Sequence, residues 1–352
     1  MSTNKTLIFK KVPTGIPVAG EHLAVEDRPI DISSPPPGGV TLSILFASFD
    51  PYLRGKMRPS HITSFSPAFE LEAPITNDTV ARVLGSDTDA YKPGDLVIAN
   101  LPLAEYAVLR EGELGRIRSK VHNRHGLKDL GLFLGPLGMP GMTAWSSLYE
   151  IGQPKKGETI FISSAAGAVG QIVGQIAKRE GLRVIGSVGS DEKLEFIVKE
   201  LGFDGGFNYK KERARDVLKR LAPDGLDIYY DNVGAEQLED ALGAMNDFGR
   251  IVACGMVQAA NYNVPEEQRY GVRTLYNIVR KRLTMRGFIV YDHGFWDKYE
   301  QDHQTKMQQW LAEASIKAKL DVTEGIDNAA EGFVKLCQGK NFGKAVLKIK
   351  DE

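Results

Sequence analysis

Hydrophobic and polar residues alternate along the first third of the chain in short runs that predict β-strands. Apolar or alternating runs occupy residues 7–12, 40–50, 80–86, 95–100 and 105–110, and Pro, Gly and Asp turns separate them. Short strands with such turns between them are typical of small antiparallel sheets and barrels. We therefore expect residues 1–135 to form a β-rich domain with the character of a partly open barrel.

Beyond residue 135, apolar strands alternate with helical segments. Strands are predicted at residues 159–162, 183–188, 205–209, 226–233, 249–255 and 283–290. Helices are predicted at residues 142–151, 168–179, 191–201, 213–221, 236–245, 296–314 and 329–338. This alternation predicts an α/β domain over residues 136–322, built on a doubly wound parallel sheet with right-handed crossovers. The segment 323–352 ends in a strand at residues 344–349, which we expect to return to the first domain.

The stretch TIFISSAAGAVGQIVG, residues 159–174, predicts a dinucleotide site because it joins a buried strand, a glycine-bearing turn and a helix. Gly167 lets the backbone approach a pyrophosphate, and Gly170 allows close packing of helix on strand. The helix N-terminus offers free N–H groups to phosphates. Ala165 stands where the full fingerprint has glycine, so the glycine pattern alone is incomplete. Its position between a strand and a helix is what supports the prediction of a dinucleotide site.

The end of the next predicted strand indicates which nicotinamide cofactor binds. An NAD site needs an Asp or Glu there to hold the ribose hydroxyls, but the strand ends in Val188, Gly189 and Ser190. Lys193 follows closely. A cation near a strand end that lacks a carboxylate favours the 2′-phosphate of NADP(H). The alternative is that residues 191–193 are only a helix start, capped by Ser190 with acids in the first turn.

Charge and composition exclude several other classes of partner. The 352 residues carry a net charge of −1, without a long basic block, which argues against nucleic acid or an anionic membrane surface. No apolar run is long enough to span a bilayer, and the N-terminus lacks a signal-peptide core. Two cysteines, Cys254 and Cys337, indicate a reducing compartment, so we expect a cytoplasmic protein without disulfides.

The sequence offers no pattern for a metal or a covalent nucleophile. A catalytic zinc needs three His, Cys or carboxylate ligands, and the chain has no C-x-x-C pair. His122 and His125 lie in a polar segment, whereas His61 and His293 are isolated. We therefore expect no metal site. Hydride transfer assisted by hydrogen bonds to the substrate oxygen is the chemistry that remains.

Eight stretches, in order, resemble the zinc-independent medium-chain dehydrogenase/reductases of the prostaglandin reductase (leukotriene hydroxydehydrogenase) and NADPH-dependent alkenal double-bond reductase type. They are DPYLR (50–54), PLGMPGMTAW (136–145), AAGAVGQIVGQIAK (165–178), GSDEK (189–193), FNYK (207–210), YDNVG (230–234), RGFIV (286–290) and NFGKAV (341–346). The resemblance covers nearly the whole chain. It implies a GroES-like domain followed by a Rossmann domain that binds NADP(H).

The resemblance also implies an activity, which is reduction of the carbon–carbon double bond of α,β-unsaturated aldehydes and ketones. It implies a homodimer paired through the edge strand at residues 283–290. The cofactor-binding residues that it implies are Gly167, Ala168, Val169, Gly170, Gln171, Lys193, Tyr209, Asn232, Cys254, Phe288, Ile289, Val290 and Asn341. Tyr52 and Tyr262 match the family's substrate-side tyrosines and are the expected catalytic residues, with the Tyr262 hydroxyl as a donor to the developing enolate.

The chain departs from the family pattern at three places. Gln171 stands where the family often has Ser, residues 254–263 differ in the loop expected over the nicotinamide, and Trp145 replaces a common Tyr at the expected substrate pocket. Three other functions therefore stay open. These are a zinc-independent quinone reductase, an NADP-dependent alcohol or hydroxy-fatty-acid dehydrogenase, and a cofactor-binding protein without catalysis.

Overall fold

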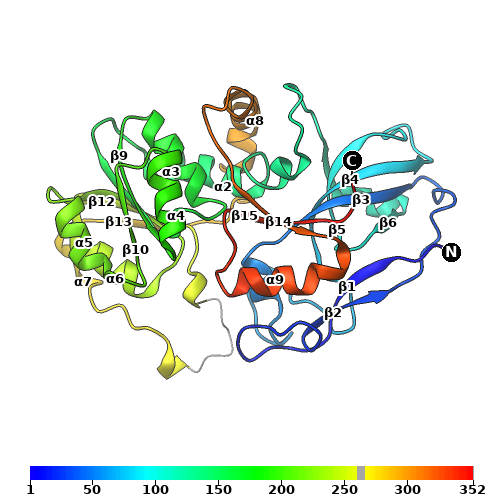
Figure 1. The fold of residues 1–352 in the computed structure, drawn as a ribbon, viewed down its shortest axis with the longest axis horizontal. Helices are drawn as coiled ribbons and strands as arrows, with labels where there is room; N and C mark the ends of the chain where they lie inside the picture. The colour runs from blue at the N-terminus through cyan, green and yellow to red at the C-terminus, as the bar shows by residue number, and fades with distance from the viewer. Residues whose placement is uncertain (260–265, 352) are drawn as a thin grey trace. The chain divides into compact units, whose positions relative to one another are not determined.

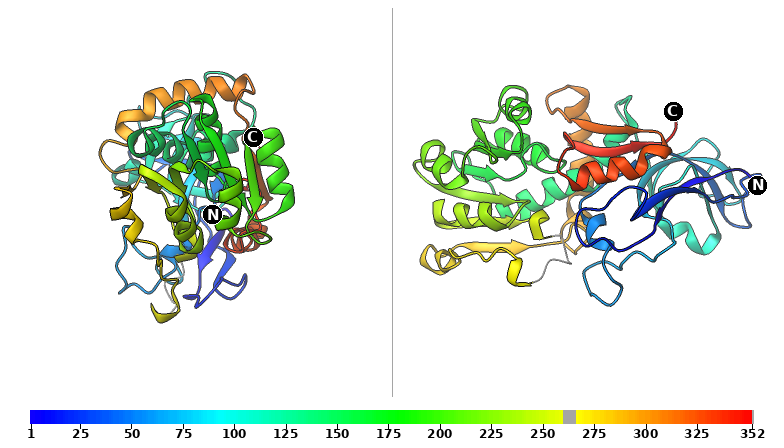
Figure 2. Two further views of the ribbon diagram at one scale, coloured as in Figure 1. Left: turned by 90° about the vertical axis from the view of Figure 1, so that its left-hand side faces the viewer. Right: turned by 60° about the horizontal axis from the view of Figure 1, so that its bottom comes forward.

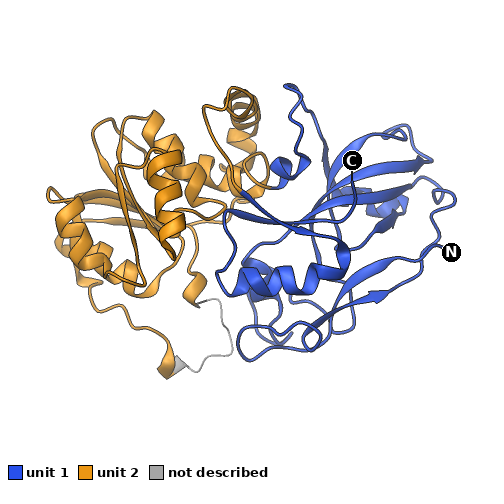
Figure 3. Ribbon diagram, in the orientation of Figure 1, with its two compact units in different colours: residues 1–134, 261–263, 320–352 blue, residues 135–260, 264–319 orange. Residues whose placement is uncertain are grey.

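A computed structural model describes residues 1–259 and 266–351 and divides the chain into two compact units (Figures 1 and 3). Unit 1 holds residues 1–134 and 320–351, and unit 2 holds residues 135–259 and 266–319. The domain boundaries expected near residues 135 and 322 stay predictions.

The helices in the described ranges are α1 (Tyr52–Lys56), α2 (Met139–Ser147), α3 (Gly170–Arg179), α4 (Asp191–Glu195), α5 (Ala214–Leu221), α6 (Ala235–Ala244), α7 (Tyr276–Arg280), α8 (Trp296–Ala312) and α9 (Ala329–Cys337). The strands are β1 (Lys5–Phe9), β2 (Leu23–Asp27), β3 (Val40–Ser48), β4 (Thr76–Ser86), β5 (Leu96–Pro102), β6 (Tyr106–Leu109), β7 (Ile117–Lys120), β8 (Thr159–Ile162), β9 (Arg183–Val188), β10 (Gly205–Asn208), β11 (Leu226–Asp231), β12 (Met245–Ala253), β13 (Thr284–Gly287), β14 (Leu320–Glu324) and β15 (Lys344–Lys348).

Unit 2 is built on a parallel six-stranded sheet in the order β10-β9-β8-β11-β12-β13. This is the strand order of a doubly wound dinucleotide fold, and Figure 2 shows helices on both faces of the sheet. On one face, Phe161, Ile185 and Tyr229 from adjacent strands pack with apolar side chains of α5 and α6. The parallel α/β sheet expected from the sequence is confirmed.

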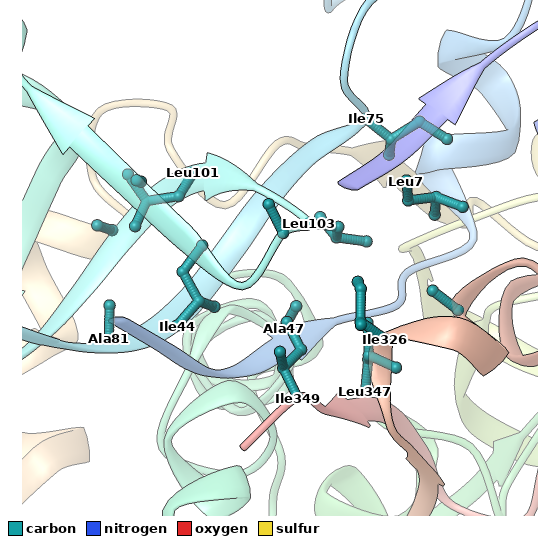
Figure 4. Close-up of a cluster of buried hydrophobic side chains, with 14 of the residues drawn as sticks. Leu7, Ile44, Ala47, Ile75, Ala81, Leu101, Leu103, Ile326, Leu347 and Ile349 are labelled. Atoms are coloured by element: carbon teal, nitrogen blue, oxygen red, sulfur yellow. The ribbon is translucent and has the colours of Figure 1, made fainter. Parts of the chain in front are cut away.

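Unit 1 contains a mainly antiparallel seven-stranded sheet in the order β14-β15-β3-β4-β5-β7, with β6 also paired to β3. Residues 40–43 of β3 pair with β6, and residues 46–48 pair with β15, so two separate strands share one edge of β3. Both faces of β3 are buried. Figure 4 shows Ala47 of β3 near Leu347 of β15 in the apolar core, as their register requires.

The predicted elements differ from the observed ones mainly at their ends. The strand expected at residues 283–290 ends at Gly287, so Phe288, Ile289 and Val290 lie in the segment that follows it. The helix expected from Ala168 begins at Gly170. The strands β2 and β7 were not predicted, because neither carries a continuous apolar run.

Candidate functional site

The first part of the site is the turn between β8 and α3. Ser164 adopts φ 52°, in the left-handed region, and its carbonyl accepts the Gly167 N–H at 2.9 Å. A Cβ atom on Gly170 would lie 2.4 Å from the Ser164 carbonyl oxygen and 2.8 Å from the Ala165 Cα. Glycine is therefore required at position 170 for the helix to start this close to the strand end.

The N-terminus of α3 has N–H groups available for an anion. No described residue accepts a hydrogen bond from the Ala168 or Val169 N–H, whereas the Gln171 N–H is bonded to the Gly167 carbonyl. Such N–H groups, with the positive end of the helix dipole, suit a pyrophosphate. The Gln171 side chain is buried and exchanges hydrogen bonds with the Lys319 backbone. Its predicted cofactor contact stays a prediction.

The second part of the site lies at the ends of β9 and β10. Ser190 caps α4, because its hydroxyl accepts the Lys193 N–H at 3.3 Å. Lys193 thus lies in the first turn of the helix. Tyr209 follows β10, and its hydroxyl would lie 3.1 Å from a Cβ placed on Gly189, so the ring closely approaches that glycine. Lys193, predicted at the 2′-phosphate, and Tyr209, which the family resemblance implies as a cofactor contact, flank the end of one strand pair.

The nearby carboxylate of Asp191 already has partners in the protein. It accepts a hydrogen bond from the Asn208 amide at 2.9 Å and pairs with the Lys211 ammonium. These two donors lower the pKa of Asp191, so it remains ionised and paired. Sequence reasoning did not find this arrangement, although Lys211 follows the FNYK stretch directly. The helix-capping alternative and the phosphate prediction are therefore compatible, because Ser190 caps the helix that carries Lys193.

The third part lies where β11 and β12 end. Asn232 is tied to the end of β8, since its side-chain amide donates to the Ser163 carbonyl and its N–H to the Ser163 hydroxyl, both at 2.8 Å. Asp231 accepts the Val233 and Gly234 N–H groups and shapes this turn. Burial raises the pKa of Asp231. Its Oδ2 atom is buried and has no hydrogen-bond partner among the described residues.

Cys254 follows β12 and is a neutral thiol in this environment. Burial raises its pKa to about 12, with a hydrogen bond to the Tyr230 hydroxyl acting in the opposite direction. A thiol of such high pKa is neither a nucleophile nor a redox centre at neutral pH. The predicted contact of Cys254 with the cofactor stays a prediction.

The segment after β13 contributes backbone and aromatic groups. Phe288 stacks on Phe295 with ring centroids 4.9 Å apart, and the Ile289 N–H donates to the Asp292 carboxylate at 2.9 Å. Val290 is buried. Trp145, expected at the substrate pocket, packs against Tyr149, His303 and Trp310 and is 2% exposed.

Unit 1 holds two further candidates. Tyr52 begins α1, and its hydroxyl donates a hydrogen bond to the Asn77 amide oxygen on β4. Asn341, which precedes β15, donates from its amide to the Gly343 carbonyl at 2.8 Å. The candidate Tyr262 lies outside the described residues. Sequence reasoning missed Asn77, because the predicted strand began only at residue 80.

The described residues do not fit a zinc ion. Within residues 1–259 and 266–351, no group of three His, Cys, Asp or Glu side chains is placed to hold a metal. His303 is buried and bonds the Pro136 carbonyl at 2.8 Å, whereas His293 is exposed beside Asp297. In the same ranges, no helix is both long and apolar enough to cross a bilayer.

The chain matches two family models and several known proteins. Residues 168–308 match the family model described as zinc-binding dehydrogenase, and residues 5–117 match the N-terminal domain of oxidoreductase. The NADP-dependent oxidoreductase RED1 of Cochliobolus heterostrophus is 49% identical over 100% of this chain and 99% of its own. The NADP(+)-dependent 2-alkenal reductase of Nicotiana tabacum is 38% identical over 99% of this chain and 98% of its own.

A solved structure has the same fold over the whole chain. CurA from Vibrio vulnificus, crystallised with NADPH, has a TM-score of 0.88 and 32% identity, covering 99% of this chain and 100% of that one. The expected GroES-like and Rossmann domains are thereby confirmed as the fold class. The NADP(H) prediction agrees with what the names of these proteins state. The chain belongs to the zinc-independent, alkenal reductase-like family of medium-chain dehydrogenase/reductases, a family of NADP-dependent oxidoreductases.

Proposed function

We propose that this chain reduces the carbon–carbon double bond of α,β-unsaturated ketones and aldehydes with NADPH. The observation that carries the proposal is the nucleotide site of unit 2, where Lys193 and Tyr209 adjoin a strand end whose nearby carboxylate, Asp191, is already paired. The reaction is supported by the 38% identity to the tobacco 2-alkenal reductase. An activated double bond is electrophilic without a metal. This fits the described residues, which hold no group of three side chains placed to bind one.

When bound, NADPH supplies a hydride to the β-carbon, and negative charge develops on the carbonyl oxygen of the substrate. The residues of the chain have two tasks in that step, which are to hold the reactants in place and to stabilise the oxyanion. The Ala168 and Val169 N–H groups suit the pyrophosphate, and Lys193 with Tyr209 suits the 2′-phosphate. We assign donation to the enolate oxygen to Tyr262, whose hydroxyl keeps its proton at neutral pH because a tyrosine pKa is about 10.

The test compares the products of different substrates in reactions with NADPH that carries deuterium at the transferred position. A saturated aldehyde or ketone with one deuterium at the β-carbon is the expected product from an enal or enone. An alcohol labelled at the carbinol carbon indicates an alcohol dehydrogenase, and turnover of a quinone with no enone indicates a quinone reductase. Either result rejects the proposal, as does NADPH binding without turnover of any substrate. Parallel reactions with NADH measure the cofactor preference.

A further inference from the structure

The turn after β10 places a lysine beside the end of β9. Asn208 is the last residue of β10 and pairs in register with Val188, the last residue of β9. The Asn208 carbonyl accepts the N–H groups of Lys211 at 2.9 Å and of Glu212 at 3.1 Å. These two hydrogen bonds fold the chain back over Asn208, so the backbone itself fixes where the Lys211 side chain begins.

The side chain of Asn208 directs its donor group at Asp191, the first residue of α4. Asn208 is 6% exposed, and its Oδ1 atom accepts the Lys210 N–H at 3.1 Å. Because the amide oxygen accepts there, the Nδ2 group is the donor on the other side, and it donates to Asp191 Oδ1 at 2.9 Å. The Asp191 carboxylate therefore lies where β9 and β10 end, next to which α4 packs (Figure 1).

Each oxygen of the Asp191 carboxylate is bound by a different donor. Asn208 holds Oδ1, and the Lys211 ammonium pairs with Oδ2. The two charged side chains are open to water, since Asp191 is 61% exposed and Lys211 is 64% exposed. An exposed ion pair contributes little to the stability of a fold. Removal of the Lys211 ammonium should therefore leave the protein folded.

The position of Asp191 matters because a carboxylate at this strand end influences which dinucleotide binds. In doubly wound folds, an Asp or Glu at the end of the second strand accepts a hydrogen bond from the ribose 2′-hydroxyl of NAD. The same negative charge repels the 2′-phosphate of NADP. In unit 2 this second strand is β9, because it pairs with β8, which leads into the glycine-bearing turn. Only Gly189 and Ser190 separate the end of β9 from Asp191.

We propose that Lys211 is a specificity-determining residue that prevents Asp191 from serving NAD(H). Its ammonium occupies Oδ2 of Asp191, so that this oxygen cannot accept a ribose 2′-hydroxyl, and it cancels the charge that would repel a 2′-phosphate. This role differs from that of Lys193, which attracts the phosphate, because Lys211 acts through Asp191. The role concerns the choice of cofactor and does not depend on which substrate is reduced.

The test measures the binding of NADP⁺ and of NAD⁺ to the full-length protein by isothermal titration calorimetry, without substrate. We expect Lys211→Ala to weaken NADP⁺ binding by about fivefold, because the charge of Asp191 is no longer cancelled. The same change should tighten NAD⁺ binding by about fivefold, the effect of one hydrogen bond of average strength. The pyrophosphate of NAD⁺ is anionic, so the loss of a cation by itself would weaken NAD⁺ binding. Tighter binding therefore requires the freed carboxylate.

Asp191→Asn identifies the group through which Lys211 acts. In the Asp191→Asn background, Lys211→Ala should no longer tighten NAD⁺ binding, because a neutral amide is a weaker acceptor than a carboxylate. Lys211→Arg keeps a cation that can pair with Asp191 and should retain the preference of the wild type for NADP⁺. Lys219→Ala is the matched control, because Lys219 is an exposed lysine of the same unit that pairs with Asp216 within α5. It should change neither affinity.

Two results would overturn this role of Lys211. One is NAD⁺ binding that stays unchanged or weakens in Lys211→Ala, and the other is a tightening that persists in the Asp191→Asn background. Thermal unfolding shows whether each variant is folded, and Lys211→Met, which keeps most of the side chain, replaces Lys211→Ala if that variant is not. Because the titrations need no substrate, failure of the protein to reduce any enone leaves this test valid. Refutation of the role of Lys211 likewise leaves the proposed reaction open.

Discussion

Lys193 stands in the first turn of α4, where Ser190 caps the helix and Asp191 is paired with Lys211. We expect Lys193→Ala to lower the ratio of kcat/KM for NADPH over NADH by about tenfold or more, because hydrogen bonds to charged groups are worth about 1.5–3 kcal/mol. Steady-state kinetics with both cofactors measure this ratio. Lys199→Ala removes an exposed lysine of the following turn, paired with Glu195, and should leave the ratio unchanged. An unchanged ratio in Lys193→Ala would contradict the 2′-phosphate assignment.

His303 on α8 gives the protein a dependence of stability on pH. Burial lowers its pKa from 6.5 to about 4, and the ring bonds the Pro136 carbonyl. The unfolded chain therefore binds a proton that the folded chain does not, and the free energy of unfolding falls as pH decreases from about 6.5 toward 4. The loss at pH 5 relative to pH 8 is about 2 kcal/mol, at about 1.36 kcal/mol for each pKa unit.

His303→Gln should remove this part of the pH dependence, because the glutamine amide does not titrate and can still donate to the Pro136 carbonyl. Urea unfolding at pH 5 and pH 8 gives the difference for each protein. His293→Gln is the control, because His293 is 97% exposed in its side chain and should change the pH dependence little. Equal pH dependence in wild type and His303→Gln would show that another group is responsible.

At the scale of elements, the contact of α3 with β8 depends on glycine. A Cβ at position 170 would meet backbone atoms at 2.4 and 2.8 Å, which no side-chain rotation can relieve. We expect Gly170→Ala to destabilise the protein by about 1–3 kcal/mol and to weaken NADPH binding by displacing the phosphate-binding turn. Gly243→Ala in α6 is the matched control, because a Cβ there meets nothing within 4 Å. Thermal unfolding and NADPH titration compare the two variants, and equal behaviour would reject this role of Gly170.

The elements that could be predicted from sequence are those whose buried residues form a continuous apolar run. β8, β9 and β15 carry such runs and appear within one residue of their predicted ends. β2 and β7 are partly exposed strands with charged residues, so their pairing partners, rather than their composition, make them strands.

The same reasoning explains the candidate site. The glycine turn, Ser190 and Lys193 follow a local pattern and were found. Asn77 was missed because the predicted strand began only at residue 80, and Lys344 was missed because a polar residue in a strand usually faces solvent. Only the pairing of β15 with β3 brings Lys344, 294 residues away in the chain, to Asp50.

At the scale of the whole molecule, β13 is an edge strand of the parallel sheet, and Thr284, Arg286 and Gly287 are exposed. We expect two copies to pair through this edge, because an open edge offers unpaired N–H and C=O groups. Light scattering should give about 77 kDa, twice the 38.7 kDa of one chain. Met285→Lys should favour the monomer, whereas Val322→Lys on the edge strand β14 of unit 1 should not. A monomeric wild type would contradict this expectation.

The divided edge of β3 has a consequence for synthesis on the ribosome. Residues 40–43 gain their neighbour β6 early, but residues 46–48 wait for β15, nearly 300 residues later. Until then three of the nine residues of this apolar strand lack a partner on one edge, a state in which chains aggregate. Unit 2 can complete its sheet during that interval. We therefore expect the first-made part of the chain to stay open to aggregation for longest, and slower translation before residue 344 should lower the yield of folded protein.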